Sequence, residues 1–371
     1  MLSSTLRIAA ALAASCAVAG GAAAAAGAGL YGLSPSVQLL RVYDNGTTSA
    51  LGAPLTHLDP AQGLAVIDQR NAALLAILFN TSSQQPELVG FDLATGGVVS
   101  STPLSWLGDG YLVGLGQALA MNARNGRVII AGQLANKSTH VVGQLDRLAG
   151  TYKEFARYDD CDFVDGVGGS QAAYDPVLNA VVLQAAPRKR PPPPFPDFSA
   201  VLLSVSVATG SILRTYGAGG NLQISSTVYD NETGLVFGLG ARLNESDPNG
   251  WSRTLLRLRT ADLAVSEVGV VATPWVTEFG AGAALDAVGR AFYWVGGLNE
   301  SIHLVKLDLA TARVTSTGAA WDSNTYPWAI DYYQGPAGAE EGAASDNPEE
   351  AATGATADEF LFARGRMWRA V

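Results

Sequence analysis

The densest group of residues suited to chemistry is a set of four aspartates within seven positions, Asp159, Asp160, Asp162 and Asp165. Carboxylates this close repel one another unless water or a shared cation neutralises them, and calcium takes six to eight oxygen ligands. The spacing differs from an EF-hand loop, because Asp165 misses the second step by one position. The cluster predicts a calcium site, and a solvated acidic loop is the alternative.

Nucleophilic catalysis finds little support in the sequence. A serine hydrolase needs a nucleophile beside a base, but the chain has no G-x-S-x-G motif and only three histidines, His57, His140 and His303. No histidine pair has the spacing of a zinc site, and thiolate ligands are lacking. We therefore predict no catalytic residue, and we expect His140 and His303 to be ordinary sheet residues.

Aromatic side chains precede several of the apolar strands. Amphipathic aromatics at the mouth of a channel suit the binding of sugars or peptides. Packing between neighbouring structural units is the alternative. The candidates for a ligand face are Trp106, Tyr111, Trp275, Trp321, Tyr326 and Trp328.

A repeated hairpin must position these residues. Each copy reads as two short strands joined by a tight turn, most clearly in IHLVKLDLATARVTSTG. The copies lie at residues 37–52, 86–102, 140–155, 200–216, 253–268 and 302–318.

A second marker comes before most hairpins: an apolar segment that ends in an acid or amide, turns, and resumes as a strand. Asp and Asn suit such turns because their side chains bond the nearby backbone. The markers are Asp68, Asn122, Asp175, Asp230, Asp286 and Asp331, at spacings of 54, 53, 55, 56 and 45 residues.

Each unit thus holds four short antiparallel strands, a to d, in about 50 residues, which is typical of a β-propeller blade. No sustained helical period is present, so we expect almost no helix. A parallel α/β fold would need crossover helices, and a β-sandwich would not explain a regular repeat.

The ends of the chain complement each other. Five blades are complete, the N-terminal copy at 37–52 supplies only strands c and d, and residues 328–333 and 359–371 supply a and b. We predict an all-β, six-bladed propeller closed by a blade that the two termini share, which removes the open sheet edge.

The hairpins resemble YVTN and NHL-type repeats and, more broadly, the quinoprotein-amine-dehydrogenase-like propellers. The residues that carry the resemblance are the D-L-A-T turns at Asp92 and Asp308 and the ends of strand a at Asp175 and Asp230. The resemblance implies a scaffold that binds a partner or, in a minority of relatives, a redox or hydrolytic enzyme. Ser100 stands where the quinone-dependent repeat has Trp, which argues against that cofactor.

The N-terminus has the pattern of a signal peptide over residues 1–28, with Arg7, an apolar run and several A-x-A cleavage sites. The remaining residues, 30–371, form the propeller domain, with no membrane span after cleavage. Six N-x-Ser/Thr sequons agree with secretion and predict a glycoprotein. They begin at Asn45, Asn80, Asn136, Asn231, Asn244 and Asn299.

The net charge of −10 comes mostly from one segment. Between Gly335 and Glu359 the chain has seven acidic residues and no basic one, and we predict a disordered acidic insertion at about 335–358. The body is near neutral, which excludes a basic face for nucleic acid. Cys161 is left alone once the signal with Cys16 is removed, so no internal disulfide is expected.

Three functions fit these observations. The first is a secreted, glycosylated propeller that binds an extracellular protein or carbohydrate through its d–a and b–c loops. The second is a calcium-dependent hydrolase of the six-bladed lactonase type, and the third is a non-catalytic structural protein. Calcium is the one cofactor that the sequence suggests, and the sequence gives no prediction of the oligomeric state.

Overall fold

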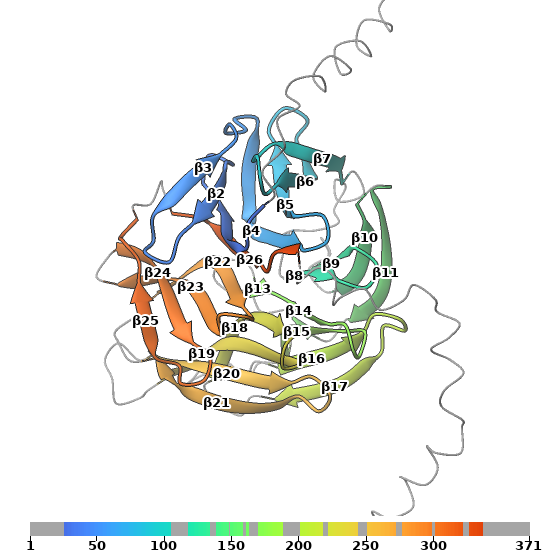
Figure 1. Cartoon of the computed structure of the whole chain (residues 1–371). Helices are drawn as coiled ribbons and strands as arrows, with labels where there is room; N and C mark the ends of the chain where they lie inside the picture. The colour runs from blue at the N-terminus through green and yellow to red at the C-terminus, as the bar shows by residue number, and fades with distance from the viewer. Residues whose placement is uncertain are drawn as a thin grey trace, which may run out of the picture.

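The computed structural model is a ring of six β-sheets around a central axis (Figure 1). It describes residues 26–104, 118–133, 139–147, 149–158, 161–162, 170–187, 201–217, 222–243, 251–271, 277–298, 301–321 and 326–336. Every named element in these ranges is a strand, so the prediction of an all-β, six-bladed propeller is confirmed. Within the same ranges, no helix has the length and hydropathy needed to cross a membrane.

Four blades, numbered II, III, V and VI, have the predicted order of four consecutive antiparallel strands. In each blade strand a is nearest the axis. Blade II holds β4 (Leu58–Asp68), β5 (Ala73–Asn80), β6 (Gln85–Asp92) and β7 (Val98–Pro103). Blade III holds β8 (Ala118–Asn122), β9 (Arg127–Gln133), β10 (His140–Asp146) and β11 (Thr151–Tyr158). Blade V holds β18 (Leu222–Asp230), β19 (Leu235–Leu243), β20 (Trp251–Arg259) and β21 (Ala264–Val271). Blade VI holds β22 (Thr277–Asp286), β23 (Ala291–Leu298), β24 (Ser301–Asp308) and β25 (Val314–Thr317).

Blade IV departs from this pattern at its inner edge. Its strands b to d are β15 (Ala180–Pro187), β16 (Val201–Ser206) and β17 (Ile212–Gly217). The place of strand a is split between β12 (Cys161–Asp162) and β14 (Ala173–Asp175), which pair with opposite ends of β15. Between them, β13 (Ser170–Gln171) pairs in parallel with β8 and so joins blade III to blade IV near the axis (Figure 1).

Blade I is shared by the two ends of the chain, as expected, but the division differs from the prediction. Its order is β26 (Ala329–Tyr333), β1 (Gly29–Leu33), β2 (Leu39–Val42) and β3 (Thr48–Leu51). The N-terminus therefore supplies three strands and the C-terminus one, so the expected two-and-two division is wrong. The expected strand b, in residues 359–371, lies outside the described residues, and β1 fills its position by pairing with both β26 and β2.

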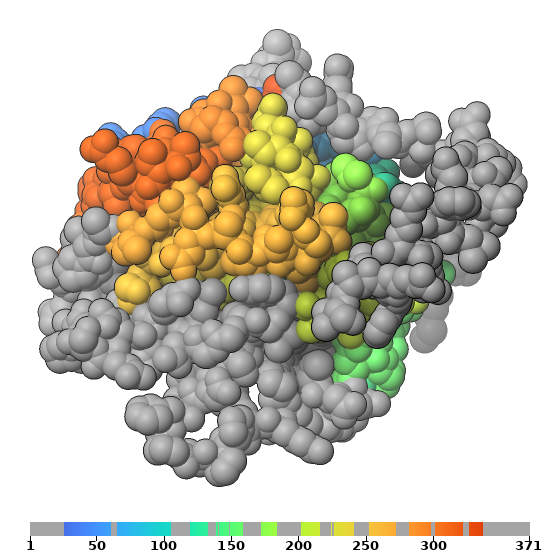
Figure 2. All heavy atoms as spheres, turned by 90° about the horizontal axis from the view of Figure 1, so that it is seen from below, coloured from blue at the N-terminus to red at the C-terminus, as the bar shows by residue number. Residues whose placement is uncertain are grey.

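The core is a ring of six apolar layers, one between each pair of neighbouring blades. Side chains alternate across each strand, so one strand feeds two layers. In β5, Leu74 packs toward blade I and Leu75 toward blade III. In β1, Tyr31 packs toward blade II and Leu30 toward blade VI, so apolar packing joins blade I to both of its neighbours. Figure 2 shows another such contact from the rim, with the gold strands of blade V beside the orange strands of blade VI.

The D-L-A-T sequences form the c–d turns. The Asp92 carboxylate accepts hydrogen bonds from the Ala94 and Thr95 backbone N–H groups and from the Thr95 hydroxyl. Asp308 repeats the arrangement, and its bond from the Thr311 hydroxyl is the largest favourable influence that holds its pKa below the ordinary value. Gly96 ends the first turn at φ +72°, pressed against the backbone of β3. The motif is therefore a turn and blade-packing device.

Candidate functional site

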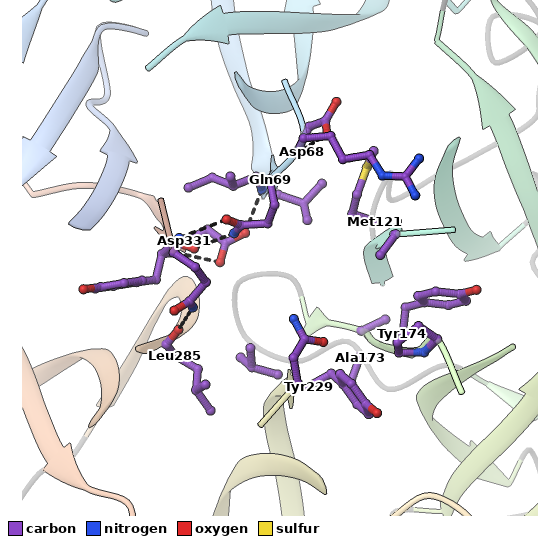
Figure 3. A pocket seen from close by; sticks show the side chains of 18 of the residues that line it. Asp68, Gln69, Met121, Ala173, Tyr174, Tyr229, Leu285 and Asp331 are labelled. Atoms are coloured by element: carbon purple, nitrogen blue, oxygen red, sulfur yellow. Dashed lines mark hydrogen bonds between the residues drawn. The ribbon is translucent and has the colours of Figure 1, made fainter. Parts of the chain in front are cut away.

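A cavity of about 140 Å³ lies on the axis at the ends of the six inner strands, on the face that carries the a–b turns. β4, β8, β14, β18, β22 and β26 each supply lining residues. Figure 3 shows the side chains arranged around a central opening, with Asp331 and Gln69 on one side and Met121 and Tyr174 on the other. We call this cavity the axial pocket.

Most of the acidic markers at the strand ends are structural clamps. Asp68, Asp175 and Asp230 are each 2 % exposed or less, and one carboxylate oxygen of each accepts backbone N–H groups of its own a–b turn. The other oxygen accepts a bond from a side chain of the next blade. Arg147 donates to Asp68, Thr260 to Asp175, and Arg290 Nη1 to Asp230 at 2.7 Å.

Asp331 holds the same place in blade I but has different partners. Its Oδ2 accepts the Ile67 backbone N–H of β4 at 2.7 Å, and its Oδ1 accepts the Tyr332 N–H at 2.7 Å. None of the described Arg or Lys side chains pairs with it. Burial therefore dominates, and it raises the pKa of the Asp331 carboxyl from 3.8 to about 7. Asp331 is the group in the axial pocket that gains or loses a proton near neutral pH.

Two glutamines fix the backbone around Asp331. Gln334 Nε2 donates to the Leu285 carbonyl at 2.6 Å, and Gln334 Oε1 accepts the Ala287 N–H. Gln69 Nε2 donates to the Tyr332 carbonyl at 2.7 Å, and its oxygen accepts the Gln334 N–H. These bonds join blade I to blades VI and II and hold the end of β26 in place.

The phenols of the pocket stay neutral. Burial, followed by the nearby Asp175 carboxylate, raises the pKa of Tyr229 to about 12. Burial and the Asp286 carboxylate raise the pKa of Tyr332 well above its usual range. The pocket thus offers neutral hydroxyls, backbone groups of the inner strand edges, the Arg70 guanidinium and two carboxyls. Of the two carboxyls, Asp68 is bonded by Arg147, whereas Asp331 has no cationic partner among the described residues. The described residues contain no cluster of three or more His, Cys, Asp or Glu able to hold a metal.

Three of the predicted ligand-face aromatics, Trp321, Tyr326 and Trp328, are described, and they lie on the opposite face, where the d–a loops run. Trp321 and Trp328 are 8 % and 7 % exposed, and their indole N–H groups donate to the carbonyls of Gly46 at 2.8 Å and Ser34 at 2.6 Å. Tyr326 is half-buried against the same two apolar layers. These three aromatics thus pack between neighbouring blades, which was the alternative to ligand binding. Trp106, Tyr111 and Trp275 lie outside the described residues.

Of the proposed calcium ligands, Asp159, Asp160 and Asp165 lie outside the described residues. Asp162 falls in β12, where its backbone pairs with Ala186. The structure therefore neither assembles nor separates this cluster.

Three of the six sequons lie in the described residues. Asn45 and Asn231 are exposed, and Asn231 stands at the rim of the axial pocket. Asn80 is half-buried, and its amide donates to Glu87 at 2.7 Å. Asn136, Asn244 and Asn299 lie outside the described residues.

Asp331 is the residue that sequence reasoning did not single out, although two signals marked it. Its spacing of 45 from the previous marker is the shortest, and Tyr-Tyr follows it where Asp68 and Asp230 are followed by polar turn formers. The second signal reflects the pairing of β26 with β1, from the other end of the chain, in the place where the other blades have the strand that follows strand a. Of the histidines, His303 Nδ1 bonds the Gly318 carbonyl at 2.9 Å, as suits a sheet residue.

The sequence matches no protein-family model, and no curated protein is significantly similar to it. Solved structures do resemble it. TolB from Acinetobacter baumannii has a TM-score of 0.52 at 11% identity, covering 82% of this chain, which spans 66% of TolB. The periplasmic gluconolactonase PpgL from Pseudomonas aeruginosa has a TM-score of 0.48 at 12% identity, and the match covers 83% of this chain and 99% of PpgL. An oligogalacturonate lyase in complex with manganese has a TM-score of 0.46 at 12% identity, and the match covers 76% of this chain and 73% of the lyase. At these identities the likeness is one of fold, and the chain is a six-bladed β-propeller.

Proposed function

We propose that this propeller is a secreted glycoprotein that binds a small, hydroxyl-rich molecule of the carbohydrate class in its axial pocket. The observation that carries the proposal is Asp331, a buried carboxyl with no cationic partner among the described residues, at the wall of an axial cavity. The loops of the opposite face remain our proposed docking surface for an extracellular protein or a larger carbohydrate.

The hydrogen-bonding capacity of Asp331 supports this ligand class. A carboxylate has about four acceptor positions, and the described bonds, from Ile67 and Tyr332, use two. Adjacent hydroxyls of a sugar are donors suited to the remaining positions, and bonds to an ionised group are about twice as strong as neutral ones. The cavity of about 140 Å³ is smaller than the roughly 300–1,000 Å³ of drug-sized sites. It therefore favours a single sugar ring over a polymer.

The test is calorimetric titration with a panel of neutral monosaccharides at about pH 8, where Asp331 is ionised. Asp331→Asn keeps the size of the side chain but removes the charge, so binding should weaken at least tenfold. Asp262→Asn, which breaks an exposed ion pair with Arg259, is the matched control and should bind like the parent. A ligand that binds the parent and the Asp331 variant equally would contradict the proposal.

A lactonase-type hydrolase is the second candidate. The observation that favours it is the Asp331 pKa of about 7, because a general base works best when its pKa lies near the working pH. In this proposal Asp331 takes the proton from an attacking water. Calcium held by Asp159, Asp160, Asp162 and Asp165 is proposed as a separate site, because β12 pairs with the end of β15 away from β14, which lines the axial pocket.

A panel of lactones and phosphate esters, assayed with and without chelator, tests the second candidate. Turnover that falls in Asp331→Asn supports a hydrolase, and chelator-sensitive turnover that falls in a four-fold Asp→Asn variant supports the calcium site. No turnover in any arm rejects the hydrolase and leaves the binding proposal standing. Secretion and glycosylation are tested together, by the glycosidase-sensitive mass of protein secreted from a eukaryotic host.

A further inference from the structure

A second cavity lies on the a–b turn face, between blades II and III. It has a volume of about 530 Å³, and it is lined by three arginines that come from three different turns: Arg70, Arg127 and Arg147. Arg70 follows β4, Arg127 begins β9, and Arg147 follows β10. We call this cavity the arginine pocket. It shares Arg70 and Gly126 with the axial pocket, so the two lie side by side.

The described contacts leave the Arg127 and Arg147 guanidinium groups with unused donors. Arg127 makes one ion pair, at 3.5 Å to Asp146, which is well beyond the 2.7–2.9 Å typical of a charged hydrogen bond. Arg147 is bonded through Nη1 alone, to the buried Asp68. Each guanidinium carries five N–H groups, so both side chains keep donors for a ligand.

Neighbouring groups add to the donor character of the arginine pocket. Asn125 lines it, and its side-chain oxygen accepts the Arg127 backbone N–H at 3.0 Å, which leaves the amide N–H₂ as the part available to a ligand. Asp68, one of the two carboxylates nearby, is already bonded by Asn71 and Arg147. Three cations therefore face two acids, on a chain whose net charge is −10.

From this geometry we infer that the arginine pocket is a binding site for the anionic group, phosphate or carboxylate, of a small molecule. Planar guanidinium forks match the oxygens of both groups. Arg147 is held in place by Asp68, while the half-exposed Arg127 is the side chain that closes on the anion. The site does not depend on Asp331, because none of its donors is in contact with that residue among the described bonds.

The test is titration of the protein with inorganic phosphate at constant ionic strength, read by calorimetry and by thermal unfolding. Arg127→Gln and the double variant Arg70→Gln/Arg127→Gln are compared with Arg259→Gln, an exposed arginine in a c–d turn of blade V on the same face. Unfolding in chloride alone checks that each variant is folded. Arg147 is left intact because its loss would strand the buried Asp68 carboxylate.

We expect saturable phosphate binding to the parent and to Arg259→Gln, and at least tenfold weaker binding to Arg127→Gln. Parallel arms with glycerol phosphate and acetate distinguish a phosphate ester from a carboxylate as the group that the site prefers. An anion that raises the melting temperature of the parent and the double variant equally acts as a general salt and overturns the proposal. Absence of saturable binding of all three anions to the parent overturns it as well. Asp331→Asn should bind phosphate like the parent, which separates this site from the axial pocket.

Discussion

Asp331 occupies the same position in its blade as Asp68 and Asp230, yet its role differs because the strand beside β26 is β1, from the other end of the chain. In blades II, IV and V the carboxylate bonds its own a–b turn and a side chain of the next blade. Asp331 instead accepts the Ile67 N–H of the neighbouring strand β4. The sequence predicts the turn-forming carboxylates well, because that chemistry is local. The neighbour of Asp331 is 264 residues away, and no local pattern reveals it.

The raised pKa of Asp331 predicts a pH-dependent stability. In the folded protein the carboxyl keeps its proton up to about pH 7, whereas in the unfolded chain it loses the proton near pH 3.8. The contribution of Asp331 to the free energy of unfolding is therefore fully present below about pH 4. It is lost as the pH rises through 7, and the total loss is at most about 4 kcal/mol. Asp331→Asn should lose less stability than the parent between about pH 5 and pH 8 in urea unfolding. Asp262→Asn is the control, and equal slopes in all three proteins would contradict the assignment.

Trp328 gives a second prediction at the residue scale. Trp328→Phe keeps an aromatic ring but removes the indole N–H that bonds the Ser34 carbonyl. That carbonyl keeps its bond from the Val37 N–H, so we expect the ordinary cost of one lost hydrogen bond, about 0.5–1.5 kcal/mol. Trp321→Phe, which removes the bond to Gly46, should cost a similar amount, and the exposed Val99→Ala should cost little. Thermal unfolding measures all three. If the Trp328 variant is as stable as the parent, the indole bond does not stabilise the fold, and Trp328 is again a candidate for ligand binding.

Contacts between blades form a continuous belt on the face that carries the a–b turns. Most of the bonded groups lie in or beside an a–b turn, whereas Thr260 belongs to the c–d turn of blade V. The pairs are Gln334–Leu285, Gln69–Tyr332, Arg70–Arg124, Arg124–Pro176, Thr260–Asp175 and Arg290–Asp230. The belt positions the walls of both pockets, because their lining residues belong to the same turns.

Gln334, like Arg124, is a member of the belt that touches two neighbouring blades. Gln334→Ala removes its amide bonds to Leu285 and Ala287, so we expect a loss of about 1–3 kcal/mol in urea unfolding. Gln38→Ala is a matched control, because its amide makes one exposed bond within blade I, to Gly52. If the two substitutions have the same small effect, the belt does not hold the blades together.

The strands that the sequence analysis missed share a physical cause. β1 reads GLYGL and directly follows an Ala/Gly-rich run, so it has neither the length nor the alternation that identifies a strand. β12 and β13 have two residues each, and their pairing partners lie in β15 and β8. Long hairpins are predictable because their partners are adjacent, whereas these strands are defined by contacts that are remote in sequence.

At the scale of the whole molecule, the strands that form blade I determine how a C-terminal truncation should affect stability. The blade has its four strands without any residue beyond 336. A chain that ends at Pro336 should therefore melt within a few degrees of the full chain. A chain that ends at Pro327 loses β26 and exposes the layers around Tyr31 and Leu30, and it should be destabilised by several kcal/mol.

Thermal unfolding of both truncated chains checks this prediction. A marked loss of stability on removing residues 337–371 would show that this segment belongs to the ring, as the two-and-two division required. A chain without β26 that melts like the parent would contradict the closure of blade I.

The pairing of Tyr31 with Asp331 also has a consequence for the order of events during biosynthesis. The N-terminal strands leave the ribosome first, yet the strand that covers their inner edge follows about 300 residues later. At about 5–20 residues per second this delay is roughly 15–60 s. During that interval β1 carries an unsatisfied edge, and such edges recruit other chains. We therefore expect the incomplete chain to associate with other chains far more readily than the finished protein does.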